Sequence, residues 1–176
     1  MQKINILIIL RDHLSTLTDD NSGKISWLDI GFFYCLPIAL GVAFYLHPIA
    51  LPSSIEGALI AVFSVFGALL FSAQVALYSL SPSAPDECGD PIQNAANIER
   101  ARKEKNFFKD VNYNVSYLIL LSCIFLILFI ALMVASASAR VEGAVLTFAV
   151  THFFLSLLML VKRSHVAFSL RHSDEI

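Results

Sequence analysis

Charged residues are scarce in this sequence and are absent from four long stretches. Of the 176 residues, 15 % are charged and 57 % are hydrophobic, so the chain lacks the polar surface that a soluble domain of this size exposes. Lys, Arg, Asp and Glu are missing from residues 30–55, 57–85, 111–139 and 143–161. Because about 20 apolar residues in a helix cross a bilayer core of ~30 Å, we predict an all-α polytopic membrane protein with four transmembrane helices.

Patterns typical of catalysis and of metal or cofactor binding are also missing. The three cysteines, Cys35, Cys88 and Cys123, have no Cys-x-x-Cys spacing, and the five histidines form no metal-binding motif. The sequence contains no glycine-rich phosphate loop, no nucleophile elbow and no paired catalytic carboxylates. No Asp or Glu lies inside a predicted span, apart from Glu56 at the first residue of the second, which argues against a proton-coupled transporter. We expect no enzyme activity, no cofactor, no metal and no direct nucleic-acid binding.

End signals place the four spans at 30–46, 56–80, 113–139 and 143–161. Pro37 predicts a kink in the first span, and Ser53 with Glu56 has the spacing of a capping box at the start of the second. Residues 81–112 are predicted to be a loop followed by a helix, 91–110, which begins at Pro91 and can run directly into the third span.

Basic residues predict the orientation of the chain in the membrane. Eleven of the twelve Lys and Arg residues lie before the first span, between the second and third spans, or after the fourth; only Arg140 lies in the opposite connections. Since cytoplasmic segments carry the excess of Lys and Arg, we predict that both termini and residues 81–112 are cytoplasmic.

An amphipathic helix is predicted over residues 1–18. Leu7, Leu10, Leu14 and Leu17 recur at spacings of three and four, which places them on one face. The other faces are left to Lys3, Arg11, Asp12, His13 and Thr16. Two locations fit such a helix equally well, the membrane interface and a contact with another subunit.

The segment LTDDNSGKISWLD, residues 17–29, partly matches a calcium-binding EF-hand loop. Gly23 fits the sixth position of that loop, but Thr18 stands at the first position, where the loop needs a carboxylate. We predict a turn that acts as a hinge between the amphipathic helix and the first span, with no calcium site.

Two polar side chains fall inside predicted spans, His152 at the centre of the fourth and Gln74 near the cytoplasmic end of the second. An intramembrane histidine indicates either a neutral ring bonded to a neighbouring helix or a proton- or ligand-sensing group. Small residues recur every fourth position and predict helix packing or oligomer contacts; they are Ser64, Ala68, Ser72 and Ala76 on the second span, and Ala131, Ala135 and Ala139 on the third.

The predicted cytoplasmic helix 91–110 is densely charged and ends in two aromatic residues. It is either a solvated helix beside the headgroups or a docking surface for a cytosolic partner or anionic lipid. The candidate docking residues are Arg100, Arg102, Lys103, Lys105, Phe107 and Phe108.

The arrangement ILRDHLSTLTDD…GKISWLDI, followed by four short spans with both ends inside, resembles the KwaA family, the membrane subunits of the bacterial antiphage defence system Kiwa. The resemblance covers most of the chain in architecture, and its specific part is the N-terminal third. It implies an inner-membrane homo-oligomer, with a tetramer favoured, that senses infection and works with a cytosolic DNA-binding subunit, KwaB. It assigns no individual functional residue.

Two functions fit these features of the sequence. The first is a sensor and scaffold whose cytoplasmic face holds a soluble effector. The alternative is a pore-forming abortive-infection effector that depolarises the membrane, with the Ser/Ala face of the second span and Gln74 lining a narrow path. Against the pore, the predicted spans contain no charged side chain beyond Glu56 at the end of the second, so none lies inside to form a selectivity ring.

Overall fold

The computed structural model of this protein describes residues 6–17, 30–49, 51–52, 54–79 and 91–173, and within these ranges every regular element is a helix. In chain order they are α1 (Ile6–Ser15), the π-helix η1 (Gly31–Cys35), α3 (Leu36–Leu46), α4 (Ser54–Ser79), α5 (Pro91–Val134) and α6 (Ala139–Ser173). The predicted all-α class is thus confirmed for the part of the chain that the structure describes.

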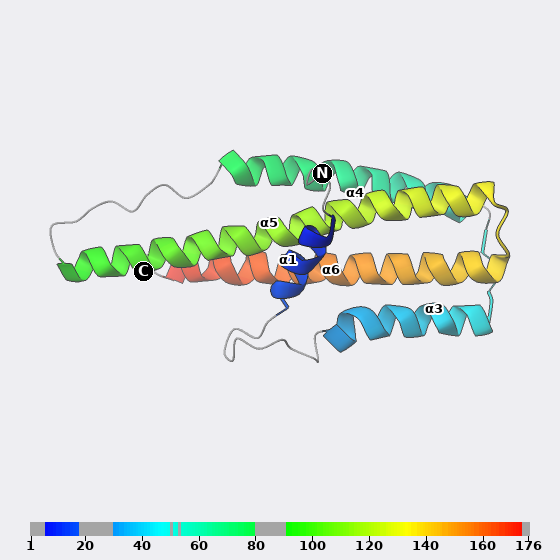
Figure 1. Cartoon of the computed structure of the whole chain (residues 1–176), viewed down its shortest axis with the longest axis horizontal. Coiled ribbons are helices and arrows are strands. Elements are labelled where there is room, and N and C mark those ends of the chain that lie inside the picture. The colour runs from blue at the N-terminus through cyan, green and yellow to red at the C-terminus, as the bar shows by residue number, and fades with distance from the viewer. Residues whose placement is uncertain (1–5, 18–29, 50, 53, 80–90, 174–176) are drawn as a thin grey trace.

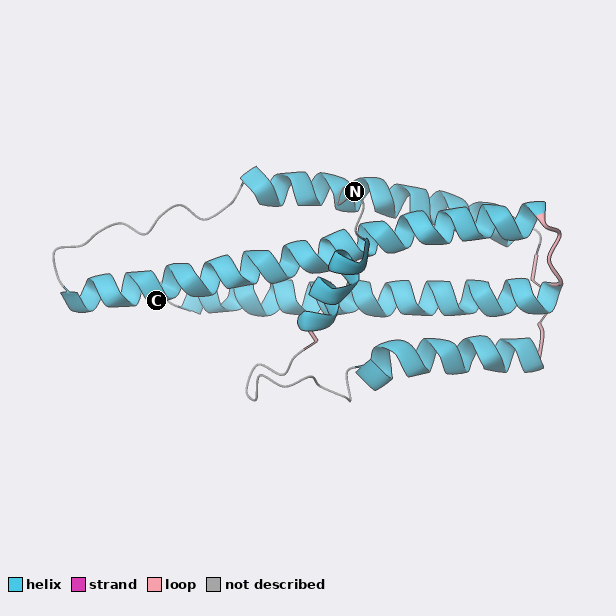
Figure 2. Ribbon diagram, in the orientation of Figure 1, coloured by secondary structure: helices cyan, strands magenta, loops and turns pink. Residues whose placement is uncertain are grey.

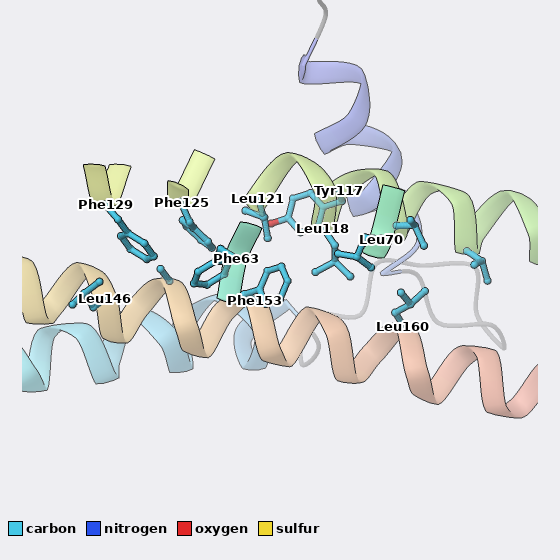
Figure 3. Packing of buried hydrophobic residues seen from close by; sticks show 13 residues of the cluster. Phe63, Leu70, Tyr117, Leu118, Leu121, Phe125, Phe129, Leu146, Phe153 and Leu160 are labelled. Carbon is cyan, nitrogen blue, oxygen red and sulfur yellow. The ribbon is translucent and has the colours of Figure 1, made fainter. Parts of the chain in front are cut away.

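The long helices lie side by side in a row, in the order α4, α5, α6, α3 (Figures 1 and 2). The helix that follows α3 in the chain, α4, therefore lies at the opposite edge of the row from it (Figure 1). The short helix α1 contacts α5 and runs crosswise to it (Figures 1 and 3).

Three helical segments are long and apolar enough to cross a membrane, Ser54–Ser79, Pro91–Val134 and Ala139–His165. The remaining apolar helix, Gly31–Leu46, is shorter. It consists of the 5-residue η1 and the 11-residue α3. At 1.5 Å per residue this helix is roughly 24 Å long, against a bilayer core of ~30 Å. Length and composition thus support three of the four predicted spans. The helix at the fourth, the predicted span 30–46, is shorter than the bilayer core.

Aromatic side chains at the centre of the row join three helices. Phe63 of α4 is fully buried and makes edge-on contacts with Phe125 and Phe129 of α5 and with Phe153 of α6, at ring-centroid distances of 5.6, 5.5 and 4.9 Å (Figure 3). Such edge-to-face pairs are favourable beyond their buried area. One phenylalanine therefore links α4 to both α5 and α6.

The predicted cytoplasmic helix and the predicted third span form one continuous helix. α5 has 44 residues, and its charged part, 91–110, passes without a break into the apolar part that starts at Val111. In Figure 1 the first turns of α5 project beyond the ends of α3 and α4. The charged and apolar parts of α5 are therefore joined without a loop.

The predicted end of the third span at Ala139 was wrong, since α5 ends at Val134 and Ala139 already begins α6. The helix ends in a Schellman motif, in which Ala137 N–H donates to the carbonyl of Leu132 and Ser136 N–H donates to that of Met133. Ser136 adopts a left-handed conformation with φ 50°. Glycine usually occupies this position, so the Ser/Ala sequence carries no signal of the helix end.

Candidate functional site

Buried polar side chains hold α1 on α5. His13 Nδ1 lies 2.9 Å from Asn114 Oδ1, and the Thr16 hydroxyl lies 3.2 Å from the same oxygen and 2.7 Å from the backbone carbonyl of His13. The Asn114 Nδ2 group donates to the backbone carbonyl of Asp110, which fixes the orientation of the amide. Since an amide oxygen only accepts hydrogen bonds, the proton of the His13 ring is on Nδ1. All three side chains are at most 4 % exposed.

The surroundings of His13 disfavour its charged form. Burial lowers the pKa of His13 from 6.5 to about 4, an effect that the hydrogen bond with Asn114 opposes and that the nearby His152 and Arg163 reinforce. Arg163 of α6 also donates a hydrogen bond to the backbone carbonyl of Thr16, at the end of α1. The docked position of α1 is therefore matched to a neutral His13.

The structure divides the predicted leucine face of α1, since Leu17 is buried and Leu10 packs against the core while Leu7 and Leu14 are exposed. His13, Thr16 and Leu17 are buried, whereas Leu7 and Leu14 are 72 % and 42 % exposed. Polar groups can face the bundle here because Asn114 and Arg163 supply partners for them. Part of the apolar surface of α1 is consequently turned outward.

A second buried group connects η1, α5 and α6. The Tyr117 hydroxyl lies 2.7 Å from His152 Nε2, and His152 Nδ1 lies 2.9 Å from the carbonyl oxygen of Phe33. Because a carbonyl only accepts, His152 carries its proton on Nδ1, and Tyr117 donates to Nε2. The Tyr34 hydroxyl, 3.5 Å away, then donates to the oxygen of Tyr117.

Tyr117 joins the two groups into one network. The His13 ring stacks on the Tyr117 ring with centroids 3.7 Å apart and planes 7° apart. His152, on the hydroxyl side of Tyr117, stacks in turn on Phe148 at 5.7 Å. We call His13, Asn114, Tyr117 and His152 the buried histidine network. It connects α1 with α5 and α6, and through Phe33 with η1.

Gln74 belongs to a separate polar contact between α4 and α5. Its Nε2 group donates to Asn112 Oδ1 at 3.1 Å and to the Ser116 hydroxyl at 2.7 Å. Asn112 and Ser116 of α5 thus serve as hydrogen-bond partners of the neighbouring α4. A side-chain amide that bridges two apolar helices in this way favours a structural role for Gln74.

The candidate docking residues lie on the charged part of α5. Arg100, Arg102, Lys103 and Lys105 are exposed, and Lys103 forms an ion pair with Glu99 at 3.1 Å. Phe107 and Phe108 are half-buried, and their rings meet edge-on at 5.9 Å. The basic residues are thus exposed, whereas the two phenylalanines lie nearer the bundle on the same helix. Phe107 packs against the core.

The small residues that were predicted to mark helix packing or oligomer contacts point away from the neighbouring helices of the chain. Ser64, Ala68, Ser72 and Ala76 are all exposed on α4, as are Ala131, Ala135 and Ala139 near the end of the row. Instead, Gly67 lies against α5, where an added Cβ would be 3.5 Å from Ser122 Cβ. The Ser64 and Ser72 hydroxyls donate to carbonyls of their own helix. The exposed stripe on α4 is thus available to lipid or to another subunit.

Sequence reasoning identified His152 and Gln74 but missed His13, Asn114 and Tyr117 as a connected group. The spacing of His13 and Thr16, three residues apart on one side of a helix, was the available signal. It could be recognised only with the knowledge that this side faces α5.

The buried histidine network holds α1, α5, α6 and η1 together through hydrogen bonds. Every buried side-chain nitrogen and oxygen in the described part of the chain has a hydrogen-bond partner. The described residues include no group of three or more His, Cys, Asp or Glu that could hold a metal ion. The predicted hinge at residues 18–29, with the incomplete calcium pattern, lies outside the described residues.

Comparison of the chain with protein-family models, with curated proteins and with solved structures finds no match. The fold and the network define an all-helical protein with three helices suited to crossing a membrane.

Proposed function

We propose that this chain is a homo-oligomeric membrane sensor and scaffold of a bacterial antiphage defence system, and that it holds a cytosolic effector subunit. In this proposal the protein lies in the inner membrane with four spans and cytoplasmic termini. The short helix Gly31–Leu46 is the fourth crossing, beside α6. The resemblance to the KwaA family motivates the defence role and a KwaB-like effector as the partner.

The observation that carries the proposal is the continuity of α5. The exposed basic surface around Arg100–Lys105 and the buried Asn114 and Tyr117 belong to one helix. At 1.5 Å per residue, the charged part 91–110 extends roughly 30 Å from the apolar part. An effector bound to this rod would be coupled mechanically to the membrane-embedded helices.

Charge distribution supports a protein partner on this rod. Exposed Arg100, Arg102, Lys103 and Lys105 gather within two helical turns. Basic side chains in such a cluster favour an acidic partner surface and accelerate association. Glu99 neutralises part of the charge through its ion pair with Lys103, so the contact is expected to weaken with rising salt.

The test is co-purification in mild detergent from the native host with the neighbouring genes present. A homo-oligomer with a soluble protein in fixed stoichiometry supports the proposal. Charge reversal of Arg100, Arg102, Lys103 and Lys105 should release that protein while membrane insertion is retained. Retention of the partner by this variant would show that the basic surface is not the dock.

The matched control is Arg140→Glu. Arg140 is also exposed, but it lies near the start of α6, at the end of the bundle away from the charged part of α5 (Figure 1). This reversal should leave the partner bound. Because basic residues also set orientation, the variant must be checked for its topology, for which thiol labelling of single cysteines in intact cells and in inverted membranes is suited.

The co-purification experiment also tests the alternative function, a membrane pore. A bare oligomer without a soluble protein would shift the weight to a membrane-depolarising effector, and planar-bilayer conductance would then decide. The contacts of Gln74 with Asn112 and Ser116 weigh against a pore lined by Gln74, since its amide nitrogen is already engaged within the chain.

A further inference from the structure

The outward side of α1 combines two leucines with one arginine. Leu7, Arg11 and Leu14 are spaced by four and three residues and so share one side of the helix. Leu7 is 72 % and Leu14 42 % exposed, and the Arg11 side chain is 82 % exposed. We call these three residues the outward face of α1.

The opposite side fixes α1 at one level along the bundle. His13 and Thr16 bond to Asn114, and Arg163 bonds to the end of α1. Asn114 lies just inside the charge-free stretch 111–139, and Arg163 lies just outside the charge-free stretch 143–161. Both contacts therefore place α1 at the boundary between the apolar and the charged parts of α5 and α6.

The direction of α1 agrees with that level. α1 runs crosswise to α5 in two views (Figures 1 and 3). If α5 and α6 cross a bilayer, α1 lies along its surface, where an amphipathic helix inserts its apolar side chains at the boundary of headgroups and acyl chains.

We infer that α1 is a membrane-surface helix whose outward face binds an anionic phospholipid leaflet. Leu7 and Leu14 enter the top of the acyl region, and Arg11 contacts the phosphate groups of the headgroups. The aliphatic stem of an arginine packs on apolar surface while its guanidinium group stays at the polar level. Asp12 lies 4.0 Å from Arg11 Nε but is largely covered, whereas Lys162, which is exposed, and Arg163, which is half-buried, add positive charge at this level.

Size argues for lipid rather than a second copy of the chain as the occupant. The outward face and the neighbouring exposed side chains of Ile6 and Ile8 offer an apolar patch on the order of a few hundred Å². A stable protein interface buries about 800 Å² on each partner. A protein partner would also have to desolvate Arg11, whereas phosphate headgroups give it opposite charge and water.

The experiment uses the full chain in lipid nanodiscs, with Cys35, Cys88 and Cys123 replaced by Ala and one new cysteine carrying an environment-sensitive fluorophore. Leu14→Cys reports on the outward face, and Leu7→Cys is a second, independent position. Lys103→Cys, on the exposed part of α5, is the aqueous control. Ile127→Cys, at a side chain 70 % exposed in the apolar part of α5, is the membrane control.

Labels at 14 and 7 should be quenched by lipids that carry a quencher near the top of the acyl chain, at a depth of about 5–10 Å. Quenching by aqueous iodide without quenching by lipid would overturn the inference, because α1 would then face water. Protection from both quenchers would also overturn it, in favour of a contact with protein.

The contact of Arg11 with anionic headgroups is tested separately. Quenching at residue 14 should be stronger in discs that contain phosphatidylglycerol than in discs of phosphatidylcholine alone. Arg11→Gln should abolish this difference between lipids, and Arg11→Lys should keep it. A difference that survives Arg11→Gln would overturn the recognition of anionic headgroups by Arg11. The inference does not rest on the effector scaffold, so failure to capture an effector would leave it intact.

Discussion

His152 donates a hydrogen bond to the one backbone carbonyl that Pro37 deprives of its α-helical donor. Phe33 lies in the π-helix η1 and Pro37 in the first turn of α3; were this segment α-helical throughout, the N–H of residue 37 would bond to the carbonyl of residue 33, and proline has no N–H. In the structure, His152 Nδ1 lies 2.9 Å from the Phe33 oxygen. Neighbouring helices satisfy backbone groups freed by proline in this way, so His152 and Pro37 form a pair across α6 and the first apolar helix.

We expect Pro37→Ala to rescue part of the stability that His152→Ala removes. His152→Ala leaves the Phe33 carbonyl and the Tyr117 hydroxyl without their partner and should destabilise the protein by about 1–3 kcal/mol. Pro37→Ala restores an N–H that can bond to Phe33, so the double variant should recover part of that loss. The measurement is thermal stability in detergent for both single variants and the double variant. Strictly additive effects would refute the coupling between residues 37 and 152.

Asn114 is expected to control the docking of α1. Asn114→Leu removes the acceptor of the buried His13 ring and leaves this donor unpaired, which costs about 1–3 kcal/mol; the Thr16 hydroxyl keeps the His13 carbonyl as its acceptor. Hydrogen exchange of α1 should therefore accelerate. Asn106→Ala, at an exposed position on the same helix, is the control and should leave exchange in α1 unchanged. Equal protection of α1 in both variants would contradict this role of Asn114.

The docking of α1 should also depend on pH. The pKa of His13 falls from 6.5 to about 4 when the ring is buried, so the docked state resists protonation. The stability contributed by docking is complete above about pH 6.5 and is lost as the pH falls toward 4, by about 3 kcal/mol in total. Arg163 and His152 act in the same direction as burial, since protonation of His13 places a charge near them, whereas the hydrogen bond with Asn114 opposes the shift of the pKa.

Hydrogen exchange of α1 across this pH range, corrected for the intrinsic exchange rate, measures the effect. His13→Gln keeps a side-chain donor for Asn114 but does not titrate, so its α1 protection should vary much less with pH. An identical pH profile in both proteins would exclude His13 as the titrating group.

Gly41 allows α3 to approach α6. A Cβ at this position would lie 3.1 Å from the backbone oxygen of Ala144, and the larger Gly41→Val should separate the helices at a cost of about 1–3 kcal/mol. Gly57→Val is the matched control, because a Cβ there meets no atom within 4 Å. Thermal unfolding in detergent should show a lower midpoint for the first variant only.

Ser136 offers a stabilising substitution. It holds the left-handed position of the Schellman motif at the end of α5, with φ 50°. Left-handed backbone costs a non-glycine residue roughly 1–2 kcal/mol, so Ser136→Gly should raise the midpoint of thermal unfolding. Ser138→Gly, in the same turn, should give no such gain. A lower midpoint for Ser136→Gly would contradict the assigned strain.

The sequence alone determined the helical class and the lengths of the apolar segments. Charge-free stretches of 19 to 29 residues leave few alternatives to helices, because only internal hydrogen bonds satisfy the backbone in an apolar environment. The start of α5 at Pro91 agrees with the proline signal. Its end at Val134 could not be predicted, because Ser136 stands where a glycine would have marked the stop.

Tertiary structure decided which side of each helix is buried and with which partner. Leu7 and Leu14 of α1 point outward while His13 is buried, because the surface beneath α1 presents Asn114 and Arg163. His152 could be recognised as a polar residue in an apolar helix, but its partners are 35 and 119 residues away in the chain. Such pairings depend on the order of the helices in the row, and hydrophobic periodicity contains no information about that order.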